Sequence, residues 1–199
     1  SLGVHQARED RGVSPESRDV VLPEQVRALA ARGPAWAAYV DRLPRLVRDL
    51  LDEWSLTPDG GLLHGHASIV VPVRSDGGPA MLKVAFPDVE TEHEALALQR
   101  WGGRGAVRLL RADPHRRAVL LERLHLTDLT SLGDLEACEV VADLYRSLHV
   151  PAPPQLRTFT SYVGRWTDAL GALPRDAPLP HRLVEQALSG FRDLATDPA

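Results

Sequence analysis

A β-hairpin pattern near the middle of the chain constrains the fold more than any other feature of the sequence. Residues 67–75 (ASIVVPVRS) and 80–86 (AMLKVAF) are rich in β-branched and apolar side chains, which is typical of buried strands. Residues 76–78 (DGG) lie between them and are typical of a tight turn. The pattern therefore predicts two antiparallel strands that lie next to each other in a sheet.

The strand pattern extends on both sides of this hairpin. A helix is expected over about 89–101, ended by two glycines, and two more strands are expected over 106–113 and 116–124. A first strand should precede residues 60–68, which join it to the hairpin. The prediction is therefore an α+β fold with a five-stranded antiparallel sheet, in which one helix is inserted between the third and fourth strands.

The rest of the chain has helical patterns. Residues 23–54 are expected to be helical, with Pro44 in the first turn of a helix that runs to Trp54. The apolar face of that helix would consist of Leu46, Val47, Leu50, Leu51 and Trp54. Beyond residue 124, one more apolar stripe consists of Leu135, Cys138, Val141, Leu144, Tyr145 and Leu148. Two further helices are expected over about 159–173 and 181–194.

Composition argues against several classes of function. Of the 199 residues, 44% are hydrophobic and 25% are charged, which is an ordinary profile for a soluble protein. The net charge of −4 argues against binding nucleic acid by neutralising its phosphates. No apolar run approaches the roughly 20 residues needed to span a bilayer, so no membrane segment is expected. The single cysteine, Cys138, excludes an internal disulfide and fits a cytoplasmic location.

Lys83, in the second strand of the hairpin, is the only lysine among 23 basic residues, and the other 22 are arginine. A charge among apolar neighbours must be paired or reach the surface, because burying it alone is expensive. Lysine carries a compact point charge that suits a phosphate bound from one side. Two interpretations stay open: a lysine that reaches solvent and survives by chance, or a lysine that binds phosphate.

Glu94 is the expected partner of Lys83. On a helical wheel it falls between Leu98 and Trp101, at the centre of the apolar face of the inserted helix, whereas Glu92 points to the opposite side. A carboxylate on that face should form an ion pair with Lys83, because either charge left unpaired would cost several kcal/mol. The alternative is an ordinary surface glutamate.

The segment before the hairpin offers backbone groups to a phosphate. Gly65 is followed by His66 and by the small residues Ala67 and Ser68, so backbone N–H groups there can approach an anion closely. His64 and His66 have no carboxylate or cysteine at metal-ligand spacing, so both are expected to face solvent. No metal site is predicted.

Three stretches resemble the aminoglycoside phosphotransferase group of protein-kinase-like small-molecule kinases, and in particular its streptomycin and hydroxyurea phosphotransferase branch. They are MLKVAFPDVETEHEALALQRWGGRGAVRLLRADP (81–114), AVLLERL (118–124) and ADLYRSLHVPAPPQL (142–156). The resemblance covers roughly residue 23 to the end of the sequence. It implies a kinase-like N-lobe over 23–124 and a partial helical C-lobe over 125–199, after an extended or disordered segment at 1–22.

The resemblance also implies roles for residues in a nucleotide site. Lys83 would hold the α- and β-phosphates of ATP, Glu94 would position Lys83, and residues 65–68 would cover the phosphates. The backbone of Glu122 and Leu124 would meet the adenine ring. The implied cofactor-binding residues are Lys83, Glu94, Gly65, His66, Ala67, Ser68, Glu122 and Leu124. The acceptor would be a hydroxyl of a small molecule such as an aminoglycoside.

The sequence departs from the family in one large respect. The family's catalytic loop has the form H-x-D-x-x-x-x-N, in which Asp orients the acceptor and Asn binds Mg²⁺, but this chain contains no asparagine. The segment HLTDLTSLG, which starts at His125, has a different spacing. We therefore expect the chain to be the N-terminal portion of a kinase. This portion would contain no catalytic residue, its Mg²⁺ ligands would lie beyond residue 199, and it would be inactive by itself.

Two other classes of function remain open from the sequence. The chain could be a non-catalytic nucleotide-binding pseudokinase or a partner-binding module, which the missing loop favours. It could also be a structural α+β domain in which Lys83 has no function. Affinity for ATP separates this last hypothesis from the other two.

Overall fold

The computed structural model describes residues 20–125, 127–174 and 176–196, so most of the segment 1–22 lies outside the described residues. The chain divides into two compact units, one up to Ala152 and one from Pro153 onwards. The helices of the first unit are α1 (Glu24–Ala28), the 3₁₀ helix η1 (Leu29–Arg32), α2 (Pro34–Glu53), α3 (Glu94–Trp101), the 3₁₀ helix η2 (Leu129–Ser131) and α4 (Asp134–Leu148). The second unit contains α5 (Phe159–Gly171) and α6 (His181–Thr196).

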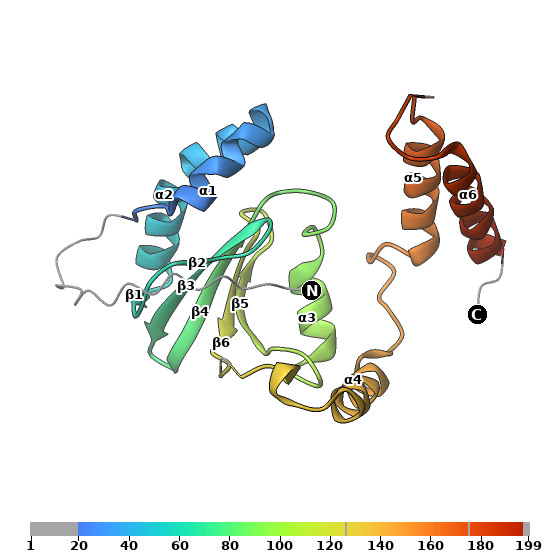
Figure 1. Cartoon of the computed structure of the whole chain (residues 1–199). Coiled ribbons are helices and arrows are strands. Elements are labelled where there is room, and N and C mark those ends of the chain that lie inside the picture. The colour runs from blue at the N-terminus through green and yellow to red at the C-terminus, as the bar shows by residue number, and fades with distance from the viewer. Residues whose placement is uncertain (1–19, 126, 175, 197–199) are drawn as a thin grey trace. The chain divides into compact units, whose positions relative to one another are not determined.

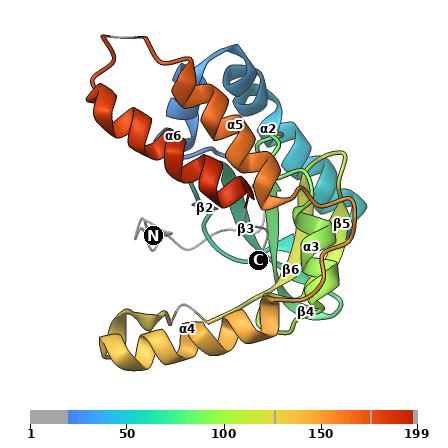
Figure 2. The ribbon, with the colours of Figure 1, turned by 90° about the vertical axis from the view of Figure 1, so that its right-hand side faces the viewer.

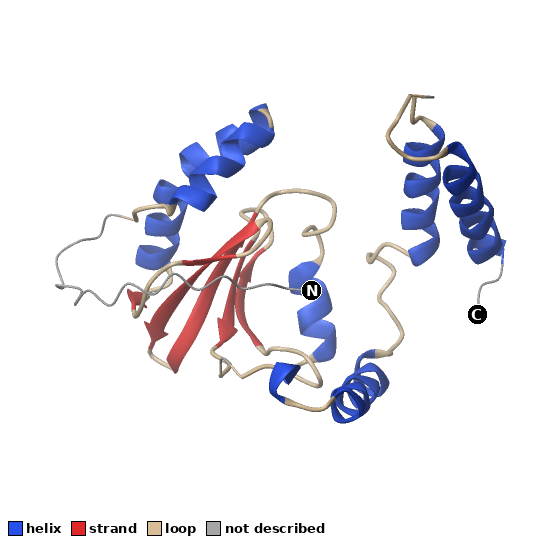
Figure 3. Ribbon diagram, in the orientation of Figure 1, coloured by secondary structure: helices blue, strands red, loops and turns tan. Residues whose placement is uncertain are grey.

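An antiparallel sheet forms the centre of the first unit (Figures 1 and 3). Its strands are β1 (Thr57–Pro58), β2 (Leu63–His64), β3 (Ser68–Ser75), β4 (Gly78–Ala85), β5 (Leu109–Asp113) and β6 (Ala118–Glu122). Their order is β1-β3-β4-β6-β5, and β2 also pairs with β3. The antiparallel sheet and the inserted helix are as expected, but the prediction of five strands was wrong, because the sheet of the described residues has six.

Pro72 accounts for the extra strand. It lies in β3 between the segment that pairs with β1 and the segment that pairs with β2. The Pro72 carbonyl accepts a hydrogen bond from the backbone N–H of Asp59 at 2.8 Å, so it points to the edge of β3 that pairs with β1 and β2. In an antiparallel ladder the N–H and the carbonyl of one residue point to the same edge, so proline leaves this edge without a donor. The ladder is interrupted there. β1 precedes residues 60–68 as expected, whereas β2 is an additional strand of 2 residues inside the segment that was expected only to connect the first strand to the hairpin.

The hairpin of β3 and β4 forms at the predicted place. Ser75 pairs with Gly78 across a two-residue turn, and the Ser75 hydroxyl donates a hydrogen bond to the Gly78 carbonyl at 3.2 Å. Gly78 has a φ of 105°, in the region that favours glycine. The turn residues therefore fix the register of the two central strands.

Helices cover β4 on both faces (Figure 1). Leu82 and Val84 are buried in the larger core with α1 and α2, whereas Met81 packs into the smaller core with Leu98 of α3. Each fully buried aliphatic side chain of this kind contributes about 1.5–3 kcal/mol. Because side chains alternate along a strand, Lys83 lies on the same face as Met81, toward α3.

The expected start of the second helix at Pro44 was wrong, because α2 begins at Pro34 and Pro44 lies inside it. Pro34 occupies the first turn, where a missing N–H has no consequence. Pro44 removes one internal hydrogen bond, a defect of about 3 kcal/mol in an isolated helix. The helix continues through this defect because one face is buried on both sides of it, by Tyr39, Leu43, Val47, Leu50 and Leu51.

The inserted helix starts later than the expected residue 89, because local side-chain hydrogen bonds hold the preceding residues in a turn. Asp88 Oδ1 accepts hydrogen bonds from the backbone N–H groups of Glu90 and Thr91, both at 2.9 Å. Thr91 Oγ1 donates a hydrogen bond to the Phe86 carbonyl at 2.6 Å. Residues 89–93 therefore form hydrogen-bonded turns, and α3 begins only at Glu94.

The helices predicted after residue 124 are present as α4, α5 and α6. The apolar stripe expected on α4 is not a buried face, because Leu135 is 76% exposed and Tyr145 is 56% exposed. α5 and α6 lie side by side (Figure 3), with the rings of Trp166 and Phe191 5.9 Å apart. Within the described residues, every helix is too short or too polar to cross a membrane.

The structure of α2 predicts the effect of replacing Pro44 by alanine. The substitution restores a helical N–H donor and removes little buried surface, so we expect the free energy of unfolding to rise by about 1–2 kcal/mol. Urea unfolding measures the change, and Pro34→Ala is the matched control, for which the change should stay below about 0.5 kcal/mol. A loss of stability in Pro44→Ala would show that α2 depends on a kink at this position.

Candidate functional site

The ion pair expected between Lys83 and Glu94 is present. Lys83 Nζ donates a hydrogen bond to Glu94 Oε1, and both side chains are 26% exposed. Lys83 lies in the centre of the sheet, where it is opposite Val70 of β3 and Val119 of β6. A cation held by one carboxylate and still partly open to solvent is available to a second anion.

Several contacts hold α3, and with it Glu94, against the sheet (Figure 2). The helix ends at Gly102, which has a φ of 58° and caps the last turn. The indole Nε1 of Trp101 donates a hydrogen bond to the carbonyl of Leu148 at 3.1 Å, at the end of α4. Arg100 Nε donates another to the carbonyl of Pro151 at 3.0 Å. These contacts fix the C-terminal end of α3, and Glu94 lies at the opposite end of the same helix, where it pairs with Lys83.

The turn between β2 and β3 contains the glycine expected near the phosphates. Gly65 N donates a hydrogen bond to the Ser68 carbonyl at 2.8 Å, and a Cβ on Gly65 would lie 3.3 Å from Ser68 Oγ. In the described part of the chain, the backbone N–H groups of His66 and Ala67 make no other backbone hydrogen bonds. Ser68 pairs with Ala85 of β4. Ala85 and Lys83 are two residues apart along this strand, which corresponds to about 7 Å.

The segment expected to meet adenine leaves the sheet at the end of β6. Glu122 is the last residue of β6 and pairs with Ala80, three residues along β4 from Lys83. Its carboxylate accepts a hydrogen bond from the backbone N–H of Arg108 at 2.7 Å. Leu124 is 61% exposed, and its N–H makes no backbone hydrogen bond within the described residues.

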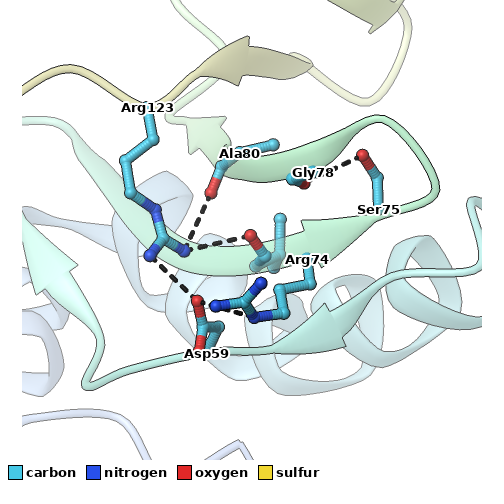
Figure 4. A network of polar contacts seen from close by, with 7 residues as sticks. Asp59, Arg74, Ser75, Gly78, Ala80 and Arg123 are labelled. Carbon is cyan, nitrogen blue, oxygen red and sulfur yellow. Dashed lines mark hydrogen bonds and ion pairs between the residues drawn. The ribbon is translucent and has the colours of Figure 1, made fainter.

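Arg123 fixes this segment to the sheet, and its role was missed from the sequence (Figure 4). Its guanidinium forms an ion pair with Asp59 at 2.9 Å and donates hydrogen bonds to the carbonyls of Val73 at 3.0 Å and Ala80 at 3.4 Å. Arg74 approaches the same carboxylate at 3.4 Å. A single arginine therefore ties the residues after β6 to β3, to β4 and to the loop that follows β1.

The remaining polar side chains near the turn do not form a metal centre in the described residues. No group of three His, Cys, Asp or Glu side chains there is placed to hold a metal ion. The elements thus bring together a paired lysine, a glycine turn with exposed N–H groups and a strand exit. All three lie along β4, on which Lys83 and the position paired with Glu122 are about 10 Å apart.

The chain matches the family described as aminoglycoside/hydroxyurea antibiotic resistance kinase over residues 53–198. It belongs to this family. The matched range includes the strands β1 to β6, the Lys83–Glu94 pair and the helices that follow. No solved structure matches the chain significantly.

Three curated relatives of this kinase family are similar to the chain. Streptomycin 6-kinase of Streptomyces glaucescens is 39% identical over 192 residues, which are 92% of this chain and 62% of the relative. Streptomycin 6-kinase of Streptomyces griseus is 45% identical over 142 residues, 69% of this chain and 45% of the relative. Hydroxyurea phosphotransferase of Kitasatospora aureofaciens is 42% identical over 146 residues, 69% of this chain and 43% of the relative. The chain therefore spans about half the length of these relatives.

The contacts of Arg123 predict a loss of stability when the guanidinium is removed. Arg123→Ala leaves the Asp59 carboxylate without its closest partner and removes a donor shared by the carbonyls of Val73 and Ala80, so unfolding should become easier by about 1–3 kcal/mol. The matched control is Arg74→Ala, because Arg74 contacts the same carboxylate but is 62% exposed. Its expected effect is below about 1 kcal/mol. Equal effects of the two substitutions in urea unfolding would contradict a special role of Arg123.

Proposed function

We propose that the chain is part of an ATP-dependent phosphotransferase that moves the γ-phosphoryl group of ATP to a hydroxyl of a small-molecule antibiotic. The observation that carries this proposal is the Lys83–Glu94 ion pair, formed between the central strand and the inserted helix of a chain from a kinase family. Two relatives are named as streptomycin 6-kinases and one as a hydroxyurea phosphotransferase. An aminoglycoside is therefore the first acceptor class to examine.

The described residues fit a nucleotide that extends along β4. Its phosphates would lie at Lys83, where a second anion can reach the ammonium group, and under the free N–H groups that follow Gly65. Its base would lie near the backbone of Glu122 and Leu124, where the chain leaves the sheet. Phosphoryl transfer needs mainly positioning and charge neutralisation, and these residues would contribute to both on the side of the nucleotide.

The proposed fold assignment is a protein-kinase-like N-lobe over 23–124, followed by part of a helical C-lobe. Bound Mg²⁺ would neutralise the phosphates. Its ligands would come from the part of the enzyme that this chain does not span, because the family motif uses an asparagine and the chain contains none. The acceptor pocket and catalytic aspartate would come from the part of the enzyme that the chain does not span. The proposed location is cytoplasmic, in agreement with the exposed free thiol of Cys138.

A second candidate function is supported by the missing H-x-D-x-x-x-x-N motif. The chain would then be a non-catalytic nucleotide-binding module. Both candidates require ATP to bind at Lys83, so only a catalytic measurement on the complete protein distinguishes them.

The role of Lys83 is tested by Lys83→Arg in the complete enzyme. Arginine keeps the charge, but its planar guanidinium does not fit the compact position between Glu94 and a phosphate, so kcat/KM should fall about a hundredfold. The melting temperature should stay close to that of the parent, because the positive charge beside Glu94 remains. Arg104→Lys, in an exposed turn, is the reverse substitution and should change neither quantity. Near-normal turnover in Lys83→Arg would contradict a phosphate-binding role.

The 199-residue chain by itself is expected to bind MgATP but to transfer no phosphoryl group. It supplies the paired lysine, but none of its residues matches the catalytic aspartate of the family motif. Radiolabelled ATP with streptomycin as acceptor measures transfer, and calorimetry measures nucleotide affinity. Phosphorylated streptomycin formed by the purified chain would refute the expectation of inactivity, and absence of ATP binding would refute the nucleotide site.

A further inference from the structure

A second cationic site lies away from the Lys83–Glu94 pair. A cavity of about 250 Å³ is bounded by α2, the end of β4 and the turn between β5 and β6. Its lining includes Arg42 and Arg45 from α2 and Arg116 and Arg117 from the turn, whereas its lining carboxylate is Asp49. None of the residues of the candidate nucleotide site lines it.

Two of the four guanidinium groups have carboxylate partners that offset part of their charge. Arg116 forms ion pairs of 2.6 Å with Glu53 and with Asp113, and these hydrogen bonds hold the pKa of Arg116 above its usual value. Arg45 lies 3.8 Å from Asp49. Their charges therefore add little to the field inside the cavity.

The other two guanidinium groups keep their charge. Arg42 makes no hydrogen bond or ion pair in the described part of the chain. Burial raises the pKa of the Tyr39 hydroxyl, and the nearby positive charge of Arg42 opposes this rise. Arg117 donates a hydrogen bond to the neutral carbonyl of Glu92 at 2.8 Å and has no ion pair within the described residues. Two uncompensated positive charges thus flank one cavity, which suits a dianion.

The backbone of Arg117 gives an independent indication of function. Its φ is 53°, in the left-handed region that favours glycine, at the end of the turn before β6. The conformation is held by the Arg117 carbonyl, which accepts a hydrogen bond from Ala85 N at 3.0 Å. Residues with strained backbone conformations gather at binding sites, and this one carries a guanidinium that lines the cavity.

We propose that this cavity binds the phosphate group of a small dianionic ligand. Arg42 and Arg117 approach the phosphate from two different elements, and buried Tyr39 and Ala85 form an apolar floor. A volume of about 250 Å³ lies just below the range of roughly 300–1,000 Å³ for small-molecule sites, so the ligand is a phosphate with a short organic body rather than a nucleotide. A phosphate monoester carries close to two negative charges above pH 7.

The probe is inorganic phosphate, titrated into the 199-residue chain by calorimetry at about pH 8, with chloride at the same ionic strength as reference. We expect saturable binding of one phosphate at this site, weakened about tenfold by Arg42→Gln and about tenfold by Arg117→Gly. Arg117→Gly should also leave the urea midpoint unchanged or raise it, because glycine relieves the positive φ. A loss of binding in a variant that is at least as stable cannot come from unfolding.

Two control variants distinguish phosphate binding in this cavity from phosphate binding at other cationic side chains. Lys83→Met, made together with Glu94→Gln so that no carboxylate is left unpaired, removes the candidate nucleotide site and should leave the cavity's phosphate binding intact. Arg104→Gln makes the same change in net charge at an exposed position outside the lining and should have no effect. The proposal is overturned if phosphate binds no better than chloride, if binding is lost only in the double variant, or if Arg104→Gln weakens it as much as Arg42→Gln.

Two further titrations distinguish a soluble phosphate ester from a membrane lipid as the source of the phosphate group. Glucose 6-phosphate presents the group on a soluble body, and vesicles that contain phosphatidic acid present it on a membrane. Binding of the sugar phosphate that is sensitive to Arg42→Gln supports the small-ligand site. Binding of the vesicles alone would overturn it.

Discussion

Burial of β4 on both of its faces is the constraint on which the first unit depends. One face carries Leu82 and Val84 into the core with α2, and the other carries Met81 toward α3. A strand in this position has no room for an unpaired charge, so Lys83 is compatible with the fold only because α3 brings Glu94 to it. The packing of the sheet and the geometry of the site are therefore consequences of the same arrangement.

Much of this arrangement was predictable from the sequence, because it follows from periodicity and from residues close together in the chain. The hairpin follows from its turn residues, and the facing of Glu94 follows from its position between Leu98 and Trp101. Both are statements about alternation along a strand or rotation around a helix, which need no knowledge of distant contacts.

The errors have a different origin. Pro72 separates the pairing of β1 from that of β2 through a missing backbone donor, and residues 89–93 form hydrogen-bonded turns before α3. Neither effect changes the hydrophobic pattern. Pro44 sits inside α2 because tertiary burial outweighs a local preference. Arg123 could not be assigned in advance, because its partner Asp59 is 64 residues away in the sequence. Local patterns thus determined the elements, whereas long-range contacts determined their ends and connections.

Family membership and geometry support different parts of the functional argument. The match over residues 53–198 establishes a kinase family, and the relatives' names suggest antibiotic acceptors. The structure adds how the parts of the site are held: α3 by the end of α4, and the segment after β6 by Arg123. Such supports lie at a distance from the proposed phosphate position, so substitutions in them would alter the alignment of the candidate site without touching a ligand.

The solitary lysine has a consequence for the chemistry of the protein surface. Because Lys83 carries the one side-chain amine of the sequence, reagents that acylate lysine can modify the side chains of this chain at a single position. That amine is 26% exposed and hydrogen bonded to Glu94, so its rate of acylation reports directly on whether the pair is closed, open or covered. Acylation of lysine in this chain therefore reports on the candidate site alone, without signal from other lysines.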